Sequence, residues 1–302
     1  MNINSYKSTG ILNKKHLVSL QNYTEENIYE ILFAAKEITA RLAAGEKLTA
    51  LKNKYIYLIT KRGFSRSRIA FETAVSKLSG SSTVSTMHGS DIDSVLKDGL
   101  SLAAIAEYGV NAIMVSTEMS TDAETLEKNV SLPVINANSK SGPCEALAAL
   151  LTVWEKKGRL SGLKVAVIGD AEEASDGFIY AFIKCGADVT AICPEGKTVR
   201  RKKTLGYCAQ YGDVIVTDDI KSGIADADVI YVSGKNSGEN FVLTEELLQT
   251  AKPEAVVLHV LPVPCENANL TEDVIKSRNF AALEQAVNLQ RILTAALYLL
   301  VK

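Results

Sequence analysis

Short runs of β-branched and aromatic residues alternate along this chain with stretches of helical spacing, and this alternation limits the fold to few choices. In the first half, strands are expected at residues 55–59, 83–86, 112–115 and 133–135. Helical stretches lie around residues 69–78 and 95–108. An amphipathic helix precedes them, beginning at Thr24 and stopped by Gly45. Such alternation is typical of a parallel sheet covered by helices.

The second half repeats this pattern. Strands are expected at residues 164–168, 189–193, 214–216, 229–232 and 256–259. A chain of 302 residues exceeds the size at which single cores stop growing, so two α/β domains in series are expected. A helix over residues 145–156 bridges them, and a final helix over 285–300 is expected to pack back on the first domain. The predicted domains are therefore residues 1–144 with 285–302, and residues 145–284.

Composition narrows the classes of partner. With 47% hydrophobic residues, 23% charged residues and a net charge of −2, the chain has no overall field that would attract nucleic acid or a membrane. Its opening residues lack the apolar core of a secretory signal, and no apolar run approaches the roughly 18 residues of a membrane span. We expect a cytoplasmic protein whose partners are small molecules or copies of itself. The five cysteines are widely spaced and indicate neither a disulfide framework nor a zinc site.

The strongest candidate site follows the first strand, where a turn carries hydroxyls and guanidiniums at the start of a helix. Ser65, Arg66, Ser67 and Arg68 combine hydroxyl donors, cationic donors and backbone N–H groups at the positive end of the helix dipole. This combination predicts binding of a small phosphorylated ligand.

A nucleotide cofactor is not expected. The strand at residues 164–168 leads into Gly169, as in a dinucleotide-binding fold, but Asp170, Glu172 and Glu173 follow it. Three carboxylates there would repel a pyrophosphate.

The three histidines lack metal-ligand spacing, so no metal site is expected. His259 ends a strand that is expected to be buried, at the edge where open α/β sheets place their sites. Two interpretations are open, a site residue or a core histidine satisfied by backbone groups.

Two polar loops follow other strands. Asn136 comes directly after the 133–135 strand, and it is either a ligand-binding residue or part of a turn that caps the next helix. Residues 233–238, which include Ser233 and Ser237, either contact a substrate or only connect two elements. The basic run at residues 200–203 is interpreted as a solvated helix face rather than an anion site.

These segments resemble one family. Ser65-Arg66-Ser67-Arg68-x-x-Phe71-Glu72 is similar to the Ser-Thr-Arg-Thr-Arg-x-x-Phe-Glu carbamoyl-phosphate motif of aspartate and ornithine carbamoyltransferases. Four further segments agree in order and spacing, residues 133–137, 142–148, 160–170 and 259–262. Residues 227–231 and 285–288 also resemble family segments and lean towards the ornithine branch.

The resemblance implies two doubly wound parallel-sheet domains joined by two linking helices, in the carbamoyltransferase fold. It implies a carbamoyl-phosphate domain, an amino-acid domain and a homotrimer with sites shared between subunits. The implied phosphate-binding residues are Ser65, Arg66, Ser67 and Arg68, and His259 is implied as catalytic. The residues implied to bind substrate are Asn136, Ser233, Ser237 and Leu261.

The chain departs from the family's pattern at several of its functional positions. Phe64 stands where the motif begins with serine, Ser116 where the family has arginine, and Gly142 where it has histidine. Glu145 replaces a glutamine, and it would repel a phosphate unless it turns away or pairs with Arg66 or Arg68. Further replacements are Val260 for cysteine, Leu289 for arginine, and residues 233–238 for the ornithine branch's Asp-Val-Trp-x-Ser-Met-Gly loop.

The resemblance therefore identifies a divergent member with a degraded carbamoyl-phosphate site. Three hypotheses remain open. The first is a carbamoyltransferase of impaired or altered activity, acting on an amino acid or small amine. The second is a catalytically inactive paralogue that serves as a ligand-binding or assembly subunit. The third keeps the fold but changes the ligand, because Phe64 and Gly142 make the pocket more apolar on one side and roomier on another.

Overall fold

The computed structural model describes residues 3–61, 65–87, 98–117, 120–137, 142–169, 173–194, 198–233, 241–263 and 269–301. The chain divides into two compact units. We call Lys7–Leu147 with Leu289–Lys302 the amino-terminal unit, and Met1–Tyr6 with Ala148–Asn288 the carboxyl-terminal unit. The division falls within two helices, α6 (Pro143–Lys157) and α12 (Ala282–Leu300).

The amino-terminal unit is built on a parallel sheet with the strand order β2-β1-β3-β4. The four strands are β1 (Tyr55–Lys61), β2 (Ser81–Met87), β3 (Val110–Ser116) and β4 (Val134–Asn136). All four strands were expected from the β-branched runs, and the structure confirms them. The first three extend beyond the expected bounds because residues on either side of the β-branched runs still pair with neighbouring strands.

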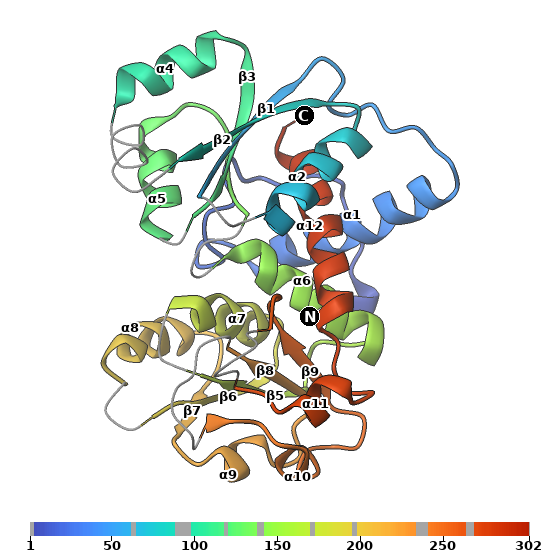
Figure 1. Ribbon diagram of the computed structural model, residues 1–302, viewed down its shortest axis with the longest axis vertical. Helices are drawn as coiled ribbons and strands as arrows, with labels where there is room; N and C mark the ends of the chain where they lie inside the picture. Colours follow the sequence, from blue (N-terminus) through green and yellow to red (C-terminus); the bar gives the residue numbers. More distant parts are fainter. Residues whose placement is uncertain are drawn as a thin grey trace. The chain divides into compact units, whose positions relative to one another are not determined.

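Helices cover both faces of this sheet (Figure 1). One face of β1 and β3 packs, through Tyr57, Ile59, Ile113 and Val115, against α4 (Gly99–Glu107) and α5 (Ser120–Asn129). The other side carries α1 (Glu25–Ala43) and α2 (Ser65–Lys77). Thr24 caps α1 as predicted, in a reciprocal capping box with Asn27.

The segment before α1 is tied to the unit by hydrogen bonds. The buried carboxylate of Glu30 accepts from the Ser8 hydroxyl at 2.6 Å, the Thr9 N–H at 3.0 Å and the Gly10 N–H at 2.6 Å. Further along, the Leu17 N–H donates to the Val134 carbonyl oxygen at 2.8 Å. The segment therefore runs beside β4 and supports its carboxyl end.

The carboxyl-terminal unit has a second parallel sheet, with the strand order β7-β6-β5-β8-β9. Its strands are β5 (Lys164–Ile168), β6 (Asp188–Ile192), β7 (Val214–Thr217), β8 (Val229–Val232) and β9 (Val256–His259). Every strand expected in this half is confirmed. Because β5 is central and the chain moves first to one side and then to the other, the sheet is doubly wound.

Figure 1 shows α7 (Glu173–Lys184) and α8 (Thr198–Cys208) on one face of this sheet and α9 (Ile220–Ile224) and α10 (Glu245–Leu248) on the other. Ile168, Ile230 and Val257 pack into the core on the α9 side, with residues of α11 (Glu272–Lys276). On the opposite face, the Phe178 and Tyr231 rings stack at 3.7 Å. Both faces are buried, as parallel sheets require.

Candidate functional site

The amino-terminal end of α2 carries the residues that the sequence predicts to bind a phosphate. The helix begins at Ser65, just beyond the carboxyl end of the central strand β1. Ser67 is buried and Arg66 is half-buried. The first-turn N–H groups of an α-helix have no partner within the helix, and the dipole there favours negative charge. This end of α2 is therefore suited to an anion.

Arg66 faces a carboxylate from α6. Its Nη2 atom lies 3.9 Å from Oε1 of Glu145, whose side chain is only 7% exposed. This distance makes an ion pair but exceeds that of a hydrogen bond. Arg66 Nε is buried and has no hydrogen-bond partner among the residues that the structure describes. Glu145 thus pairs with Arg66, which is one of the arrangements that the sequence left open.

Burial and charge act on Arg66 in opposite directions. Burial lowers the pKa of the Arg66 guanidinium, whereas the Glu145 carboxylate raises it. The guanidinium remains protonated at neutral pH because arginine is not deprotonated in proteins. Burial, with the Glu145 charge, also raises the pKa of the Cys144 thiol, so Cys144 is not a thiolate nucleophile at neutral pH.

Arg68 lies apart from this pair. Its Nη2 atom is 3.3 Å from Oε1 of Glu72 on the next turn of α2, and both side chains are exposed. The structure therefore brings Arg66 together with Glu145 and Arg68 together with Glu72. The side chain of Ser65 and the whole of Phe64 lie outside the described residues.

The ends of β3 and β4 complete this edge of the sheet. Thr60, at the end of β1, donates a hydrogen bond to the Ser116 carbonyl oxygen at 3.3 Å. The Ser116 hydroxyl is buried and makes no hydrogen bond within the described part of the chain. Asn136 is fully buried, and its Nδ2 donates to the Val18 carbonyl oxygen at 3.1 Å. The Asn136 amide therefore already fixes the segment beside β4.

The carboxyl-terminal unit has its own edge of polar residues. His259 ends β9, is fully buried, and is paired in register with Val232, the last residue of β8. Ser233 follows, and its N–H donates to the Ile168 carbonyl oxygen at 2.8 Å. The carbonyl oxygen of Ser233 accepts from Nδ2 of the buried Asn269 at 3.0 Å. The ends of β5, β8 and β9 are thus locked together around Ser233.

Gly169 shows why this edge needs a residue without a side chain. Its φ is +143°, and a Cβ built there would lie 2.3 Å from the Ser233 Cβ. The glycine turn that resembled a nucleotide fingerprint therefore serves close packing of two strand ends.

The remaining sequence predictions fall in different places. Leu261 is partly buried just beyond β9 and precedes a cis peptide bond to Pro262. Ser237 and His88 lie outside the described residues. In the basic run, Lys202 and Lys203 are exposed on α8, as expected of a solvated face.

Neither a metal site nor a membrane span is found in what the structure describes. Across those ranges, no three His, Cys, Asp or Glu side chains are grouped so that they could hold a metal ion. Among the helices of the same ranges, none is long and apolar enough to cross a membrane.

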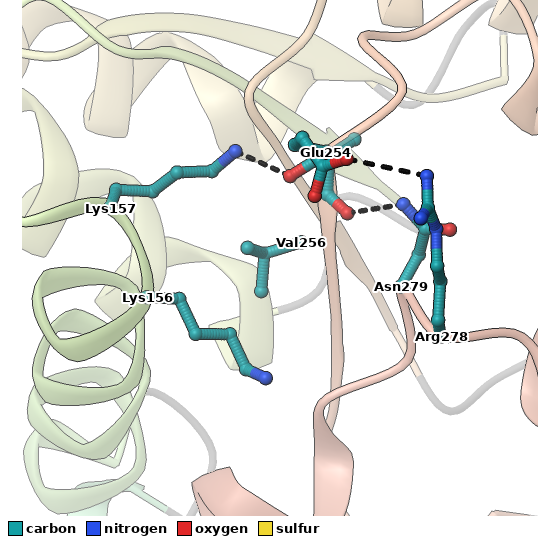
Figure 2. Close-up of a pocket in the computed structure, with 7 residues that line it drawn as sticks. Lys156, Lys157, Glu254, Val256, Arg278 and Asn279 are labelled. Atoms are coloured by element: carbon teal, nitrogen blue, oxygen red, sulfur yellow. Dashed lines mark hydrogen bonds and ion pairs between the residues drawn. The ribbon is translucent and has the colours of Figure 1, made fainter.

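A hollow lies at the amino-terminal edge of the carboxyl-terminal sheet, beside the start of β9 (Figure 2). It has a volume of about 380 Å³. Lys157 donates to the Glu254 carbonyl oxygen, Arg278 pairs with the Glu254 carboxylate at 3.3 Å, and Lys156 pairs with Glu284 at 2.8 Å. Since its cations are engaged by protein oxygens, this hollow is a surface ion-pair network rather than the candidate site.

Each unit is a doubly wound α/β layer structure with polar side chains at the carboxyl edge of a parallel sheet. This arrangement defines the class of two-domain α/β proteins that bind small molecules at their strand ends.

Comparison with known proteins gives the family. The family model described as "Aspartate/ornithine carbamoyltransferase, carbamoyl-P binding domain" matches residues 15–155, and that described as "Aspartate/ornithine carbamoyltransferase, Asp/Orn binding domain" matches residues 161–300. The chain belongs to the aspartate/ornithine carbamoyltransferase family.

Individual relatives match over nearly their whole length. Ornithine carbamoyltransferase of Pyrococcus abyssi is 32% identical, over 96% of this chain and 96% of the relative. That of Bacillus subtilis is 32% identical, over 91% and 90%. The solved ornithine carbamoyltransferase of Pyrococcus furiosus superposes with a TM-score of 0.85 at 30% identity, covering 96% of this chain and 98% of that one. The carbamoyltransferase fold expected from the sequence is confirmed.

Sequence reasoning missed two residues that shape the edges. Asn269 holds the Ser233 carbonyl oxygen from 36 residues away, and Thr60 holds the Ser116 carbonyl oxygen from 56 residues away. The only sequence signal for either is a polar residue beside an apolar run, which is common in turns.

Proposed function

We propose that the chain transfers a carbamoyl group from carbamoyl phosphate to the amino group of an ornithine-like amino acid or small amine. One observation carries the proposal. In a chain of this family, the start of α2 presents Arg66 and the buried Ser67 at the carboxyl edge of the sheet.

The reaction explains what the residues would do. An uncharged amine attacks the carbonyl carbon, negative charge develops on the carbonyl oxygen, and phosphate departs with the electrons of the broken C–O bond and takes up the proton that the amine loses. Catalysis therefore needs donors for the phosphate and the oxyanion. We assign phosphate binding to Ser65, Arg66, Ser67 and Arg68, with Arg66 as the principal cation because Arg68 is exposed and paired with Glu72.

His259 is assigned as the catalytic residue of the carboxyl-terminal unit, since it ends β9 beside the locked end of β8. Amino-acid binding is assigned to Asn136, Ser233, Ser237 and Leu261. No cofactor is required, because a neutral amine and an activated carbonyl react without redox chemistry.

We further propose residues 1–144 with 285–302 as the carbamoyl-phosphate domain and residues 145–284 as the amino-acid domain. A cytoplasmic homotrimer with intersubunit sites is proposed on the resemblance to the family.

The activity is proposed to be impaired or altered, because a buried carboxylate pairs with the principal phosphate-binding cation. The same pair favours the second candidate, a catalytically inactive paralogue that binds a ligand or assembles with another subunit.

A steady-state assay separates these candidates. Purified protein is mixed with carbamoyl phosphate and, in turn, ornithine, aspartate, putrescine and acylated ornithines, and both ureido product and released phosphate are measured. An active enzyme releases phosphate faster than the rate without protein only with its own acceptor. Arg66→Gln should lower kcat/KM by about 10²–10³. Arg41→Gln, on α1 of the same unit, removes the same charge from a side chain that pairs with Glu46, and it should change kcat/KM less than about threefold.

Absence of ureido product with every acceptor, and phosphate release no faster than without protein, would refute the transferase. Calorimetry with carbamoyl phosphate then tests the second candidate, which requires binding that Arg66→Gln abolishes.

A further inference from the structure

We infer that Glu145 determines which anions bind at the start of α2, by occupying Arg66 and by opposing ligands in proportion to their negative charge. The inference deepens the proposed function and rests on it only in taking this end of α2 as the anion site.

Geometry assigns unequal freedom to the two partners. The Glu145 side chain is 7% exposed, whereas that of Arg66 is 36% exposed. Glu145 lies in the first turn of α6, between the fully buried Cys144 and Ala146. Turning the carboxylate to solvent would disturb this packing, so Arg66 is the partner that can move. Glu145 stays in place when an anion draws Arg66 towards itself.

An incoming anion then meets two opposing effects. It must compete with Glu145 for the guanidinium, and it must approach a buried carboxylate. Removing one partner from a buried ion pair leaves a costly charge behind. Arg66 Nη2 and Glu145 Oε1 are 3.9 Å apart and share no hydrogen bond, so an anion can compete with Glu145 for Arg66. The repulsion between the anion and the Glu145 carboxylate remains.

Repulsion between charges scales with the charge of the ligand. A dianion at this end of α2 is opposed by Glu145 about twice as strongly, in free energy, as a monoanion of the same shape. With Glu145 ionised, Arg66 and Glu145 together carry no net charge, so attraction comes mainly from the helix N–H groups at the start of α2. The site is therefore selective for anions of low charge, and the glutamate is the residue that makes it so.

The test compares two tetrahedral anions that differ in charge. Sulfate is a dianion and methanesulfonate a monoanion at pH 8, and each is titrated by calorimetry at low ionic strength into the full-length protein. Glu145→Gln should raise sulfate affinity about 100-fold and methanesulfonate affinity about 10-fold. Glu124→Gln, an exposed carboxylate on α5 of the same unit, should change either by less than about twofold.

Equal gains for both anions, sulfate affinity within twofold of the unaltered protein, or no binding by any variant would overturn the inference. If Glu145→Gln unfolds at a much lower temperature than the unaltered protein, Glu145→Ala removes the same charge. It should show the same ratio between the gains in sulfate and methanesulfonate affinity.

The outcome is distinct from that of the proposed function. Turnover with unchanged anion affinities in the variant refutes the inference alone. The predicted gains without turnover on any amine refute the transferase alone.

Discussion

Replacing Glu30 by glutamine should release the segment that supports the carboxyl end of β4. Glu30 is 1% exposed, and each of its carboxylate oxygens accepts two hydrogen bonds. Oε1 accepts from the Ser8 hydroxyl and the Gly10 N–H, both at 2.6 Å. Oε2 accepts from the Thr9 N–H at 3.0 Å and the Thr9 hydroxyl at 3.3 Å.

The magnitude follows from these contacts. In Glu30→Gln one oxygen becomes an NH₂ group that faces two donors, so two charge-assisted bonds are lost. Each such bond is worth about 1.5–3 kcal/mol. We expect the free energy for local opening of residues 8–10 to fall by about 3 kcal/mol, the lower end of that sum, because the segment can relax.

Hydrogen exchange measures this opening directly. The Thr9 and Gly10 amides both donate to Glu30, and their exchange should accelerate roughly 100-fold, since 1.4 kcal/mol corresponds to a factor of ten. Glu37→Gln is the matched control on the same helix. Its side chain is 64% exposed and lies 3.7 Å from Arg41, so exchange at Thr9 and Gly10 should not change. Exchange within threefold of the unaltered protein in Glu30→Gln would refute the reasoning.

Two further predictions concern the carboxyl-terminal unit. Gly169→Ala should lower the free energy of unfolding by about 3 kcal/mol in urea titrations, because the new Cβ meets Ser233 at a positive φ. The control Gly206→Ala, in open space on α8, should be neutral or stabilising. Equal effects at the two positions would contradict this account. Burial alone would raise the pKa of Asp228, but the Lys252 ion pair and the Lys164 N–H lower it below its ordinary value. The stabilisation is therefore present above the unfolded pKa of about 3.9 and lost as pH falls through the folded pKa of Asp228. The difference in free energy of unfolding between the unaltered protein and Asp228→Asn should therefore shrink on acidification. A constant difference between pH 6 and pH 3 would argue against this.

The strands and long helices were predictable because their signals are local. Runs of β-branched residues predicted all nine strands of the described ranges, and Thr24 predicted the start of α1. Helix α5 was not expected because Ala123 and Leu126 are its only buried apolar residues within the described part, too few for a clear helical stripe.

The site was less predictable because it depends on contacts between distant residues. From the sequence, Glu145 could pair with either Arg66 or Arg68. The structure shows the pair with Arg66, because α6 places Glu145 beside that residue of α2 while Arg68 pairs with Glu72. For Asn136 the sequence left open a ligand-binding residue or part of a turn, and the structure adds a contact that neither interpretation named, a hydrogen bond from its amide to the Val18 carbonyl oxygen 118 residues away. No local pattern encodes such a choice, since both uses need the same polar residue after a strand.

The most direct test of carbamoyl transfer follows the carbon atom itself. Carbamoyl phosphate labelled with ¹³C at its carbonyl is incubated with the protein and ornithine, and the products are observed by ¹³C NMR. The account predicts a ureido carbon that forms at a rate proportional to the protein concentration and about 10²–10³ more slowly with Arg66→Gln. A label that reaches only bicarbonate, at the rate seen without protein, would contradict it.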